Sequence, residues 1–196
     1  GLARNRAAFD AIDLLPRTLV DVSARDLSCP LFGERIAMPA IIAPTGFNGL
    51  LVHEGDRQLA EAAREAGIPL CQSMVSTVAL EDIVATGVRH WMQIYPFKDR
   101  ANLAGVVKRA ERAGSEALVL TTDASVFGNR EWDRRNYRAP MKLDARNLLD
   151  VALHPRWIFD VLVPQGVPRF RNLGDFLPPG MDSARNAAAF LSAQMD

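Results

Sequence analysis

The chain has 196 residues, with 23 Lys and Arg, 23 Asp and Glu, 48% apolar residues and two Cys. This length suits one domain with a sizeable core. A formal charge of zero argues against a dedicated nucleic-acid binder, which needs a clustered basic excess. Cys29 and Cys71 form no CxxC pair, so we expect neither a disulfide framework nor a metal site. This cysteine usage is typical of a protein in a reducing compartment. No apolar run is long enough to span a membrane.

Short apolar runs alternate with helical stretches after an N-terminal lead-in. The lead-in contains one expected helix over residues 5–12, which Pro16 ends. Strands are predicted at residues 39–43, 69–72, 90–95 and 117–120. Helices are expected over residues 56–66, 79–85 and 99–113, each followed by a glycine suited to a left-handed cap: Gly67, Gly87 and Gly114.

The repeated strand–helix order predicts an α/β fold with parallel strands. Two architectures fit this order, an open doubly wound sheet and the first half of a (β/α)8 barrel. A complete barrel needs about 250 residues, and four units take the chain to residue 123, which favours half a barrel. Each expected strand ends in polar or turn-forming residues, but both architectures bind ligands at that end. The pattern alone leaves both open.

Residues 124–171 differ from the rest, with nine Lys and Arg against five Asp and Glu. A long irregular insertion after a strand is typical of a functional or mobile segment. Apolar side chains stand beside arginines here, which suits contact with a membrane surface, and a solvated loop is the alternative. The residues concerned are Trp157, Ile158, Phe159, Val161, Arg156, Arg169 and Arg171. A helix is expected over residues 183–195.

The candidate site consists of uncharged hydrogen-bonding residues at the four strand ends, which suit a planar heteroaromatic ligand. They are Thr45, Ser73, Gln93 and Thr121. Tyr95 and Arg130 could hold an anion, Arg130 through a bidentate contact with a carboxylate. The alternative is that the Ser and Thr residues only end strands and that Arg130 pairs with Glu131 or Asp133.

Other site chemistries find little support in the sequence. The Gly-rich strand end at residues 45–49 lacks the GxGxxG spacing, and no P-loop is present. Nothing pairs His53 with a nucleophile, and His154 is expected to be solvated. His90 opens a strand, so a structural role is expected.

Several stretches, in order, resemble the FMN-dependent 2-hydroxy acid dehydrogenase and oxidase family, and within it the mandelate dehydrogenase branch. They lie at residues 14–22 (LLPRTLVDV), 43–49 (APTGFNG), 93–95 (QIY), 121–123 (TTD), 128–133 (GNREWD), 153–157 (LHPRW) and 194–196 (QMD). The resemblance implies a (β/α)8 TIM barrel, of which this chain supplies the first four βα units and the long loop after the fourth strand. We therefore expect a lead-in over residues 1–38, half of an FMN-binding barrel over 39–140 and a basic insertion over 141–196.

The resemblance also implies FMN as the cofactor and assigns roles to the strand-end residues. Cofactor contacts are expected from Pro44, Thr45, Gly46, Ser73, Gln93 and Thr121, and substrate contacts in the catalytic site from Tyr95 and Arg130. The implied reaction oxidises an (S)-2-hydroxy acid, mandelate- or lactate-like, to the 2-oxo acid. Electrons would pass through the flavin to a quinone or another acceptor. Gly46 stands where oxidases more often carry Ala, which favours a dehydrogenase over an oxygen-using oxidase.

Several functional groups of this family belong to the second half of the family barrel. They are the general-base His, a substrate-binding Arg, a flavin-tuning Lys and the phosphate-binding segments. We therefore expect these 196 residues alone to be catalytically incomplete, as a truncated or cleaved chain or one completed by a second polypeptide. A non-catalytic half-barrel is the alternative. The resemblance further implies a homo-tetramer in the cytoplasm, peripheral on the inner face of the cytoplasmic membrane.

Overall fold

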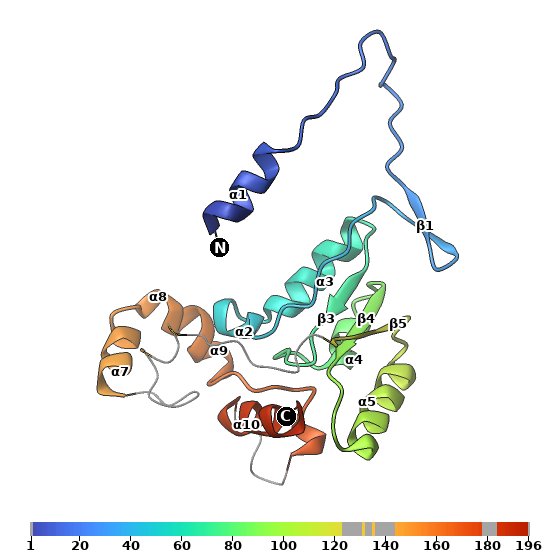
Figure 1. The fold of residues 1–196 in the computed structure, drawn as a ribbon. Coiled ribbons are helices and arrows are strands. Elements are labelled where there is room, and N and C mark those ends of the chain that lie inside the picture. Colours follow the sequence, from blue (N-terminus) through green and yellow to red (C-terminus); the bar gives the residue numbers. More distant parts are fainter. Residues whose placement is uncertain (1, 123–130, 132–134, 136–143, 178–183, 196) are drawn as a thin grey trace.

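The computed structural model describes residues 2–122, 131, 135, 144–177 and 184–195 (Figure 1). The strands are β1 (Cys29–Leu31), β2 (Glu34–Ile36), β3 (Leu70–Gln72), β4 (His90–Ile94) and β5 (Ala117–Leu120). The helices up to β5 are α1 (Leu2–Asp10), α2 (Asn48–Leu51), α3 (Gly55–Glu65), α4 (Leu80–Val84) and α5 (Arg100–Ala113). Those after β5 are α7 (Ala145–Ala152), α8 (Pro155–Trp157), a π-helix (Ile158–Leu162), α9 (Val163–Gln165), a 3-10 turn (Gly174–Phe176) and α10 (Ala184–Met195).

Three of the four predicted strands form a parallel sheet in the order β3-β4-β5. Leu70 pairs with His90, and Trp91 pairs with Ala117, so consecutive strands are neighbours joined by helical crossovers. This arrangement confirms an α/β fold with parallel strands. Within the described sheet, β5 is an edge strand.

The predicted strand at residues 39–43 is wrong as a full strand, because only Ile42 forms a bridge, to Leu70. Ile42 N donates to Pro69 O at 3.1 Å and Cys71 N donates to Ile42 O at 2.9 Å. Pro39 and Pro44 have no backbone N–H to donate, so the ladder does not extend in either direction. The segment nevertheless runs parallel to β3.

The helices before and after these strands begin and end where the sequence predicts. Asp99 Oδ1 accepts from the N–H groups of Ala101 and Asn102 at 2.8 and 3.3 Å, which satisfies two free donors of α5. The glycines Gly67, Gly87 and Gly114 have φ values of 66°, 79° and 91°. This left-handed conformation ends the turn after each helix without the strain that a Cβ would bring.

Two buried clusters hold the helices against the sheet. The smaller one packs α3 and α4 against β3, and Ala60 and Ala63 let α3 approach closely. The larger one lies between β4 and α5 and includes Met92 and Val106. It also includes Phe170, which shows that the chain beyond residue 144 packs into the same core.

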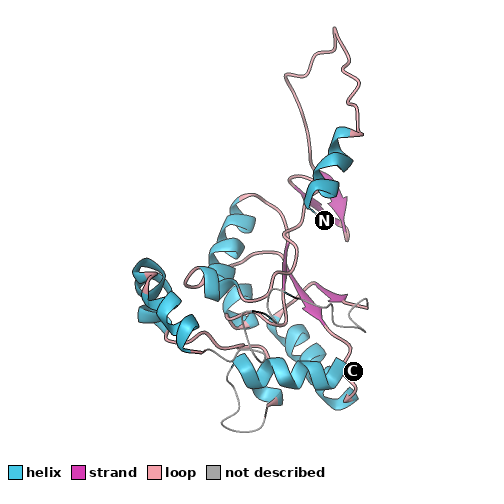
Figure 2. Ribbon diagram, turned by 60° about the vertical axis from the view of Figure 1, so that its left-hand side comes forward, coloured by secondary structure: helices cyan, strands magenta, loops and turns pink. Residues whose placement is uncertain are grey.

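The lead-in holds an element that the sequence reading missed. Besides α1, which lies within one turn of its expected place, β1 and β2 form an antiparallel hairpin (Figure 2). Phe32 and Gly33 form its turn with φ values of 50° and 84°, and the Phe32 ring lies 5.3 Å from that of Trp91. Phe32 is no typical turn residue, so the turn carried no clear signal. The segment from α1 to β1 extends away from the body and is exposed (Figure 1).

The region after residue 144 is more helical than expected. Asp144 caps α7 in a capping box with Asn147, and α8, the π-helix and α9 follow almost continuously. Residues 168–177, here called the strap, then run back along α4 and α5. Asn172 in the strap is buried, accepts from Leu80 N at 2.9 Å and donates to Val78 O at 3.3 Å.

An ionic cluster also fastens the strap. Arg109 of α5 pairs with both carboxylate oxygens of Glu81 at 2.7 and 2.8 Å and with Asp175 at 3.4 Å. The expected C-terminal helix is confirmed as α10, whose Gln194 accepts from the N–H groups of Lys98 and Asp99.

Candidate active site

Three predicted site residues meet at the carboxyl ends of the parallel strands. Ser73 Oγ donates to Gln93 Oε1 at 3.3 Å, and Gln93 Nε2 donates to Thr121 Oγ1 at 2.8 Å. Met74 N also donates to Gln93 Oε1, at 3.2 Å. Ser73 and Gln93 are almost fully buried, so the Gln93 amide is fixed in one orientation by its neighbours.

The loop formed by Pro44, Thr45, Gly46 and Phe47 lies beside this row. Phe47 N donates to Val75 O at 3.2 Å, which ties the loop to the segment after β3. A Cβ added at Gly46 would collide with Val75 Cγ2 and would lie 3.7 Å from Ser73 Oγ. Glycine is therefore required here for the backbone to approach the end of β3. Pro44 and Thr45 are exposed on the outer side of the loop.

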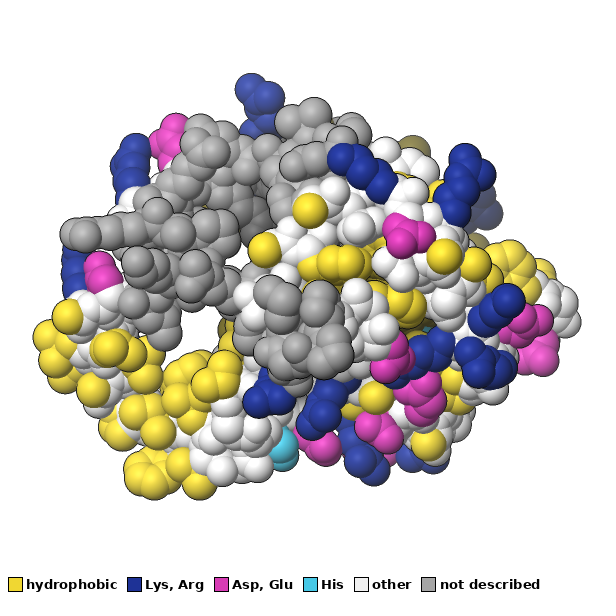
Figure 3. Space-filling model, turned by 90° about the horizontal axis from the view of Figure 1, so that it is seen from below, with side chains coloured by type: hydrophobic (Ala, Val, Ile, Leu, Met, Phe, Trp, Pro, Cys, Tyr) yellow, Lys and Arg dark blue, Asp and Glu magenta, His cyan; other side chains and the backbone are white. Residues whose placement is uncertain are grey.

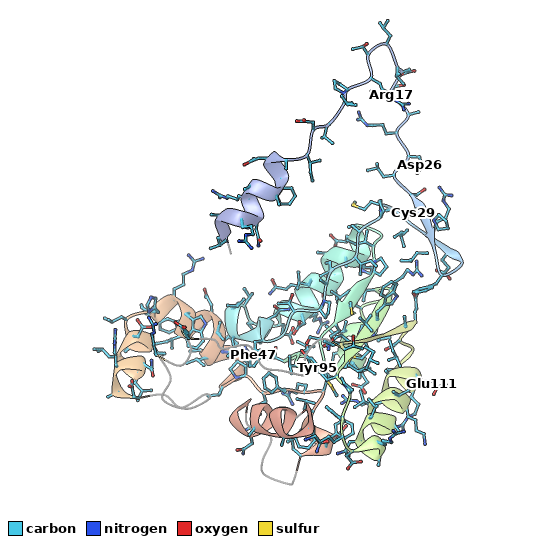
Figure 4. All side chains as sticks on the ribbon, viewed as in Figure 1. Arg17, Asp26, Cys29, Phe47, Tyr95 and Glu111 are labelled. Carbon is cyan, nitrogen blue, oxygen red and sulfur yellow. The ribbon has the colours of Figure 1, made fainter. Side chains whose placement is uncertain are left out.

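Tyr95 directly follows β4, two positions after Gln93. Tyr95 is half-buried and packs against the larger core cluster, as Phe47 does (Figure 4). Arg130, the predicted partner of a substrate carboxylate, lies outside the described residues.

The opposite face of the strands carries His90. Its Nε2 lies 2.9 Å from Gln72 Oε1 and its Nδ1 lies 2.8 Å from Ser115 Oγ. Burial lowers the pKa of His90 from 6.5 to about 4, so its imidazole is neutral at physiological pH. Both ring nitrogens are engaged, which agrees with the structural role expected for it.

The other two histidines lie apart from this row. His154 is exposed, as expected, and its Nδ1 lies 2.7 Å from Asp150 O. His53 is half-buried, and its carbonyl accepts from Gln58 Nε2 at 2.9 Å.

The described strand-end residues carry no formal charge. Their hydroxyl, amide and backbone groups can donate to and accept from the edge of a planar heteroaromatic ring, and Tyr95 adds a phenolic O–H. Ser, Thr and Gln side chains are not acids or bases near neutral pH. The arrangement can therefore bind and orient a cofactor, while acid–base chemistry needs a further residue.

The sequence reading missed a set of contacts that hold α2, the short helix directly after the loop. Trp157 Nε1 donates to Leu50 O at 2.6 Å, and Gln165 Nε2 donates to Gly49 O at 2.9 Å. The Phe170 ring meets the Phe47 ring edge-on at 4.6 Å. The partners in all three pairs are more than 100 residues apart, and no local pattern marks such pairs.

Comparison with known proteins agrees with this geometry. A profile described as FMN-dependent dehydrogenase matches residues 1–196. The chain is 40% identical over 198 residues to (S)-mandelate dehydrogenase of Pseudomonas putida, covering 100% of this chain and 49% of that protein. It is 41% identical over 157 residues to an L-lactate oxidase from a Nostoc species, covering 77% of this chain and 43% of that protein. The chain thus spans about half the length of the curated relatives it matches.

Solved structures give the same result. The crystal structure of the monotopic membrane protein (S)-mandelate dehydrogenase matches with a TM-score of 0.88 at 40% identity, covering 100% of this chain and 52% of that chain. A mandelate oxidase variant with an FMN adduct matches with a TM-score of 0.66 at 37% identity, over 74% of this chain and 45% of that one. The chain therefore belongs to the FMN-dependent dehydrogenase family, a family of oxidoreductases that use FMN.

Proposed function

We propose that the full-length protein oxidises an (S)-2-hydroxy acid to the 2-oxo acid with FMN. The observation that carries this proposal is the uncharged, hydrogen-bonded row of Ser73, Gln93 and Thr121 beside the loop at Gly46, in which Ser73 and Gln93 are buried. FMN, when bound, accepts the two electrons that leave the substrate carbon. The chain spans only half of its relatives, so activity, substrate and partners are proposals for the whole protein.

The described residues fit the flavin ring of this cofactor. The ring is planar and carries several nitrogen and oxygen atoms at its edge, which match the hydroxyl and amide groups of Ser73, Gln93 and Thr121. The close approach that Gly46 allows places backbone groups of residues 44–46 next to them. In this proposal these residues hold the ring, Tyr95 donates to the substrate, and Arg130 pairs with the substrate carboxylate.

We also infer that the parallel strands belong to a (β/α)8 barrel, of which residues 39–140 form the first half. Two features of β5 support this inference: it is an edge strand of the described sheet, and its Leu118 and Leu120 remain 43% and 52% exposed. A further strand would pair with that edge, and a helix packed over the face of β5 would cover the two leucines. The general base would then come from the second half of the barrel.

For the electron acceptor, we propose a quinone or another carrier, with oxygen as the alternative. The tight contact between Gly46 and Val75 supports the dehydrogenase side, since an Ala here, as oxidases more often carry, would force the Val75 side chain to move. The rate at which the reduced flavin is reoxidised distinguishes these two acceptors. In a dehydrogenase, a soluble quinone analogue reoxidises the flavin faster than oxygen does.

We further propose that α7–α9 rest on the cytoplasmic membrane surface. Apolar side chains gather over these helices (Figure 3). They are Leu148, Leu149, Leu153, Phe159, Val163 and Val167. Within the described residues no helix is long and apolar enough to cross a bilayer. The solved (S)-mandelate dehydrogenase is described as monotopic, which supports attachment to one face. A homo-tetramer on the inner face is part of this proposal.

The first experiment is a visible absorption spectrum of the purified full-length protein, before and after anaerobic addition of (S)-mandelate. We expect flavin bands that bleach, with (R)-mandelate as the control that leaves them unchanged. Flavin bands that persist with (S)-mandelate and also with (S)-lactate would contradict the proposed oxidation. A colourless protein that takes up no added FMN would contradict the cofactor assignment.

A further inference from the structure

Asp56 is a buried carboxylate in the first turn of α3, with 4% of its surface exposed. Its Oδ1 accepts from Asn48 Nδ2 at 2.7 Å, and its Oδ2 accepts from Ser76 Oγ at 2.6 Å. None of the ion pairs formed by the described residues involves Asp56. Two short hydrogen bonds and the positive end of the α3 dipole therefore stabilise the buried carboxylate.

The two donors belong to different segments beside the candidate site. Asn48 begins α2, and its Nδ2 also donates to Thr45 O at 3.2 Å, inside the loop. Ser76 ends the turn after β3, where its N–H donates to Ser73 O at 3.0 Å. Asp56 thus connects the loop at residues 44–47 with the segment at residues 73–76.

Ser76 also forms a hydrogen bond with a buried polar side chain of β3. Gln72 Nε2 donates to Ser76 Oγ at 2.9 Å and to Val78 O at 2.9 Å. The hydroxyl has one hydrogen and two acceptors in reach, Asp56 Oδ2 at 2.6 Å and Val78 O at 3.1 Å, and the shorter contact to the carboxylate is the favoured one. Ser76 therefore links the carboxylate to the sheet. Four side chains, those of Gln72, Ser76, Asp56 and Asn48, thus connect β3 to the loop.

Asp56 is more than a helix cap. A capping carboxylate would accept from the N–H groups of its own helix. Here both oxygens are directed to other segments, at 8 and 20 positions from Asp56 in sequence. An amide at this position would keep the shape but offer only one acceptor oxygen, and its NH2 would face a donor.

We propose that Asp56 is a positioning residue that fixes the loop at residues 44–47 before FMN binds. The inference rests on the proposed function, since the loop is the expected flavin contact. Asp56 touches neither cofactor nor substrate in this proposal and acts through Asn48. Pre-ordering the loop removes an ordering penalty that cofactor binding would otherwise carry.

The loop itself is tested by hydrogen–deuterium exchange of residues 44–52 in the full-length protein without FMN. We expect Asp56→Asn to raise exchange there, and Asn48→Ala to raise it similarly. The matched control is Asp82→Asn, because Asp82 is an exposed carboxylate in the first turn of α4. Exchange at residues 44–52 that stays at the wild-type level in a folded Asp56→Asn variant would overturn the proposal.

The consequence for the cofactor is tested by titration of the apoprotein with FMN, followed by flavin fluorescence. We expect Asp56→Asn to weaken binding about tenfold, the size of one lost charge-assisted hydrogen bond. Adding Asp56→Asn to Asn48→Ala should weaken it little further, because Asp56 acts on the loop through Asn48. Unchanged FMN affinity despite faster loop exchange would reject the link to the cofactor. If wild-type protein binds no FMN, the proposed function fails, and the exchange data still decide whether Asp56 holds the loop.

Discussion

His90 shows at the residue scale how burial sets chemistry. It stands between β3 and the end of α5, with both ring nitrogens bonded and its pKa lowered to about 4 by burial. The same residue type at position 154 is exposed. Position on the strand, and not residue type, makes His90 a structural group without a part in proton transfer.

The lowered pKa of His90 predicts a pH dependence of stability. The unfolded chain binds a proton with a pKa near 6.5, whereas the folded protein does so only near 4. The stabilisation is therefore complete above pH 6.5 and is lost as the pH falls toward 4, by about 3 kcal/mol in total. Urea unfolding across this range should show the free-energy advantage of wild type over His90→Gln shrinking as the pH falls.

The matched control for that experiment is His154→Gln, which removes an exposed imidazole. Its free energy of unfolding should follow that of wild type at every pH. An advantage over His90→Gln that stays constant from neutral to acid pH would show that His90 is protonated equally in both states.

At the element scale, residues distant in sequence supply hydrogen bonds that the short helix α2 cannot form by itself. A helix of four residues leaves its final carbonyls without partners inside the helix. Trp157 and Gln165 supply donors to two of them, at Leu50 and Gly49. The region on which the membrane proposal rests is thereby hydrogen-bonded to the helix that directly follows the loop at Gly46.

This contact predicts a local effect of Trp157→Phe. The substitution keeps an aromatic ring but removes the N–H, so Leu50 O loses its donor and α2 is destabilised by about 1 kcal/mol. Hydrogen exchange at residues 48–52 should accelerate. Trp91→Phe is the comparison, because Trp91 Nε1 has no partner among the described residues. Equal acceleration in both variants would refute a specific role for the Trp157 bond.

At the scale of the whole molecule, the apolar surface over α7–α9 is separate from the parallel sheet (Figures 1 and 3). Deleting the whole insertion would also remove Phe170 and Leu173, which belong to the core. Point substitutions on the exposed side are therefore the cleaner test of membrane attachment. Phe159 and Val163 are 67% and 65% exposed, so replacing them leaves the core intact.

We expect the double variant Phe159→Ser and Val163→Ser to sediment less with anionic phospholipid vesicles than wild type. Each lost side chain removes apolar area that the bilayer interface would bury. Phe9→Ser, an exposed apolar residue of α1, serves as the control and should sediment like wild type. Sedimentation of the double variant at the wild-type level would remove α7–α9 as the attachment surface.

Much of this architecture could be predicted from local pattern. The apolar runs of β3, β4 and β5 and the glycines after α3, α4 and α5 are signals within a few residues, and all were confirmed. The row from Ser73 to Thr121 followed, because parallel strands bring their carboxyl ends together.

The contacts that could not be predicted join residues far apart in sequence. Examples are the hydrogen bonds of Asp56 with Ser76 and of Trp157 with Leu50. These contacts depend on the tertiary structure, which a periodic sequence pattern does not encode. The hairpin at Phe32 was missed because a bulky residue adopts a left-handed conformation there. The short strand at Ile42 was overestimated because its flanking prolines limit pairing.

The strap has a consequence for the order in which the protein assembles on the ribosome. The first N–H of α4, at Leu80, finds its acceptor on Asn172, which is synthesised 92 residues later. Until the strap emerges, the donor at the start of α4 and the guanidinium of Arg109 lack their Asn172 and Asp175 partners. Closing so long a loop is entropically unfavourable and slow. The start of α4 can therefore reach its final hydrogen bonding only after residue 172 has been synthesised.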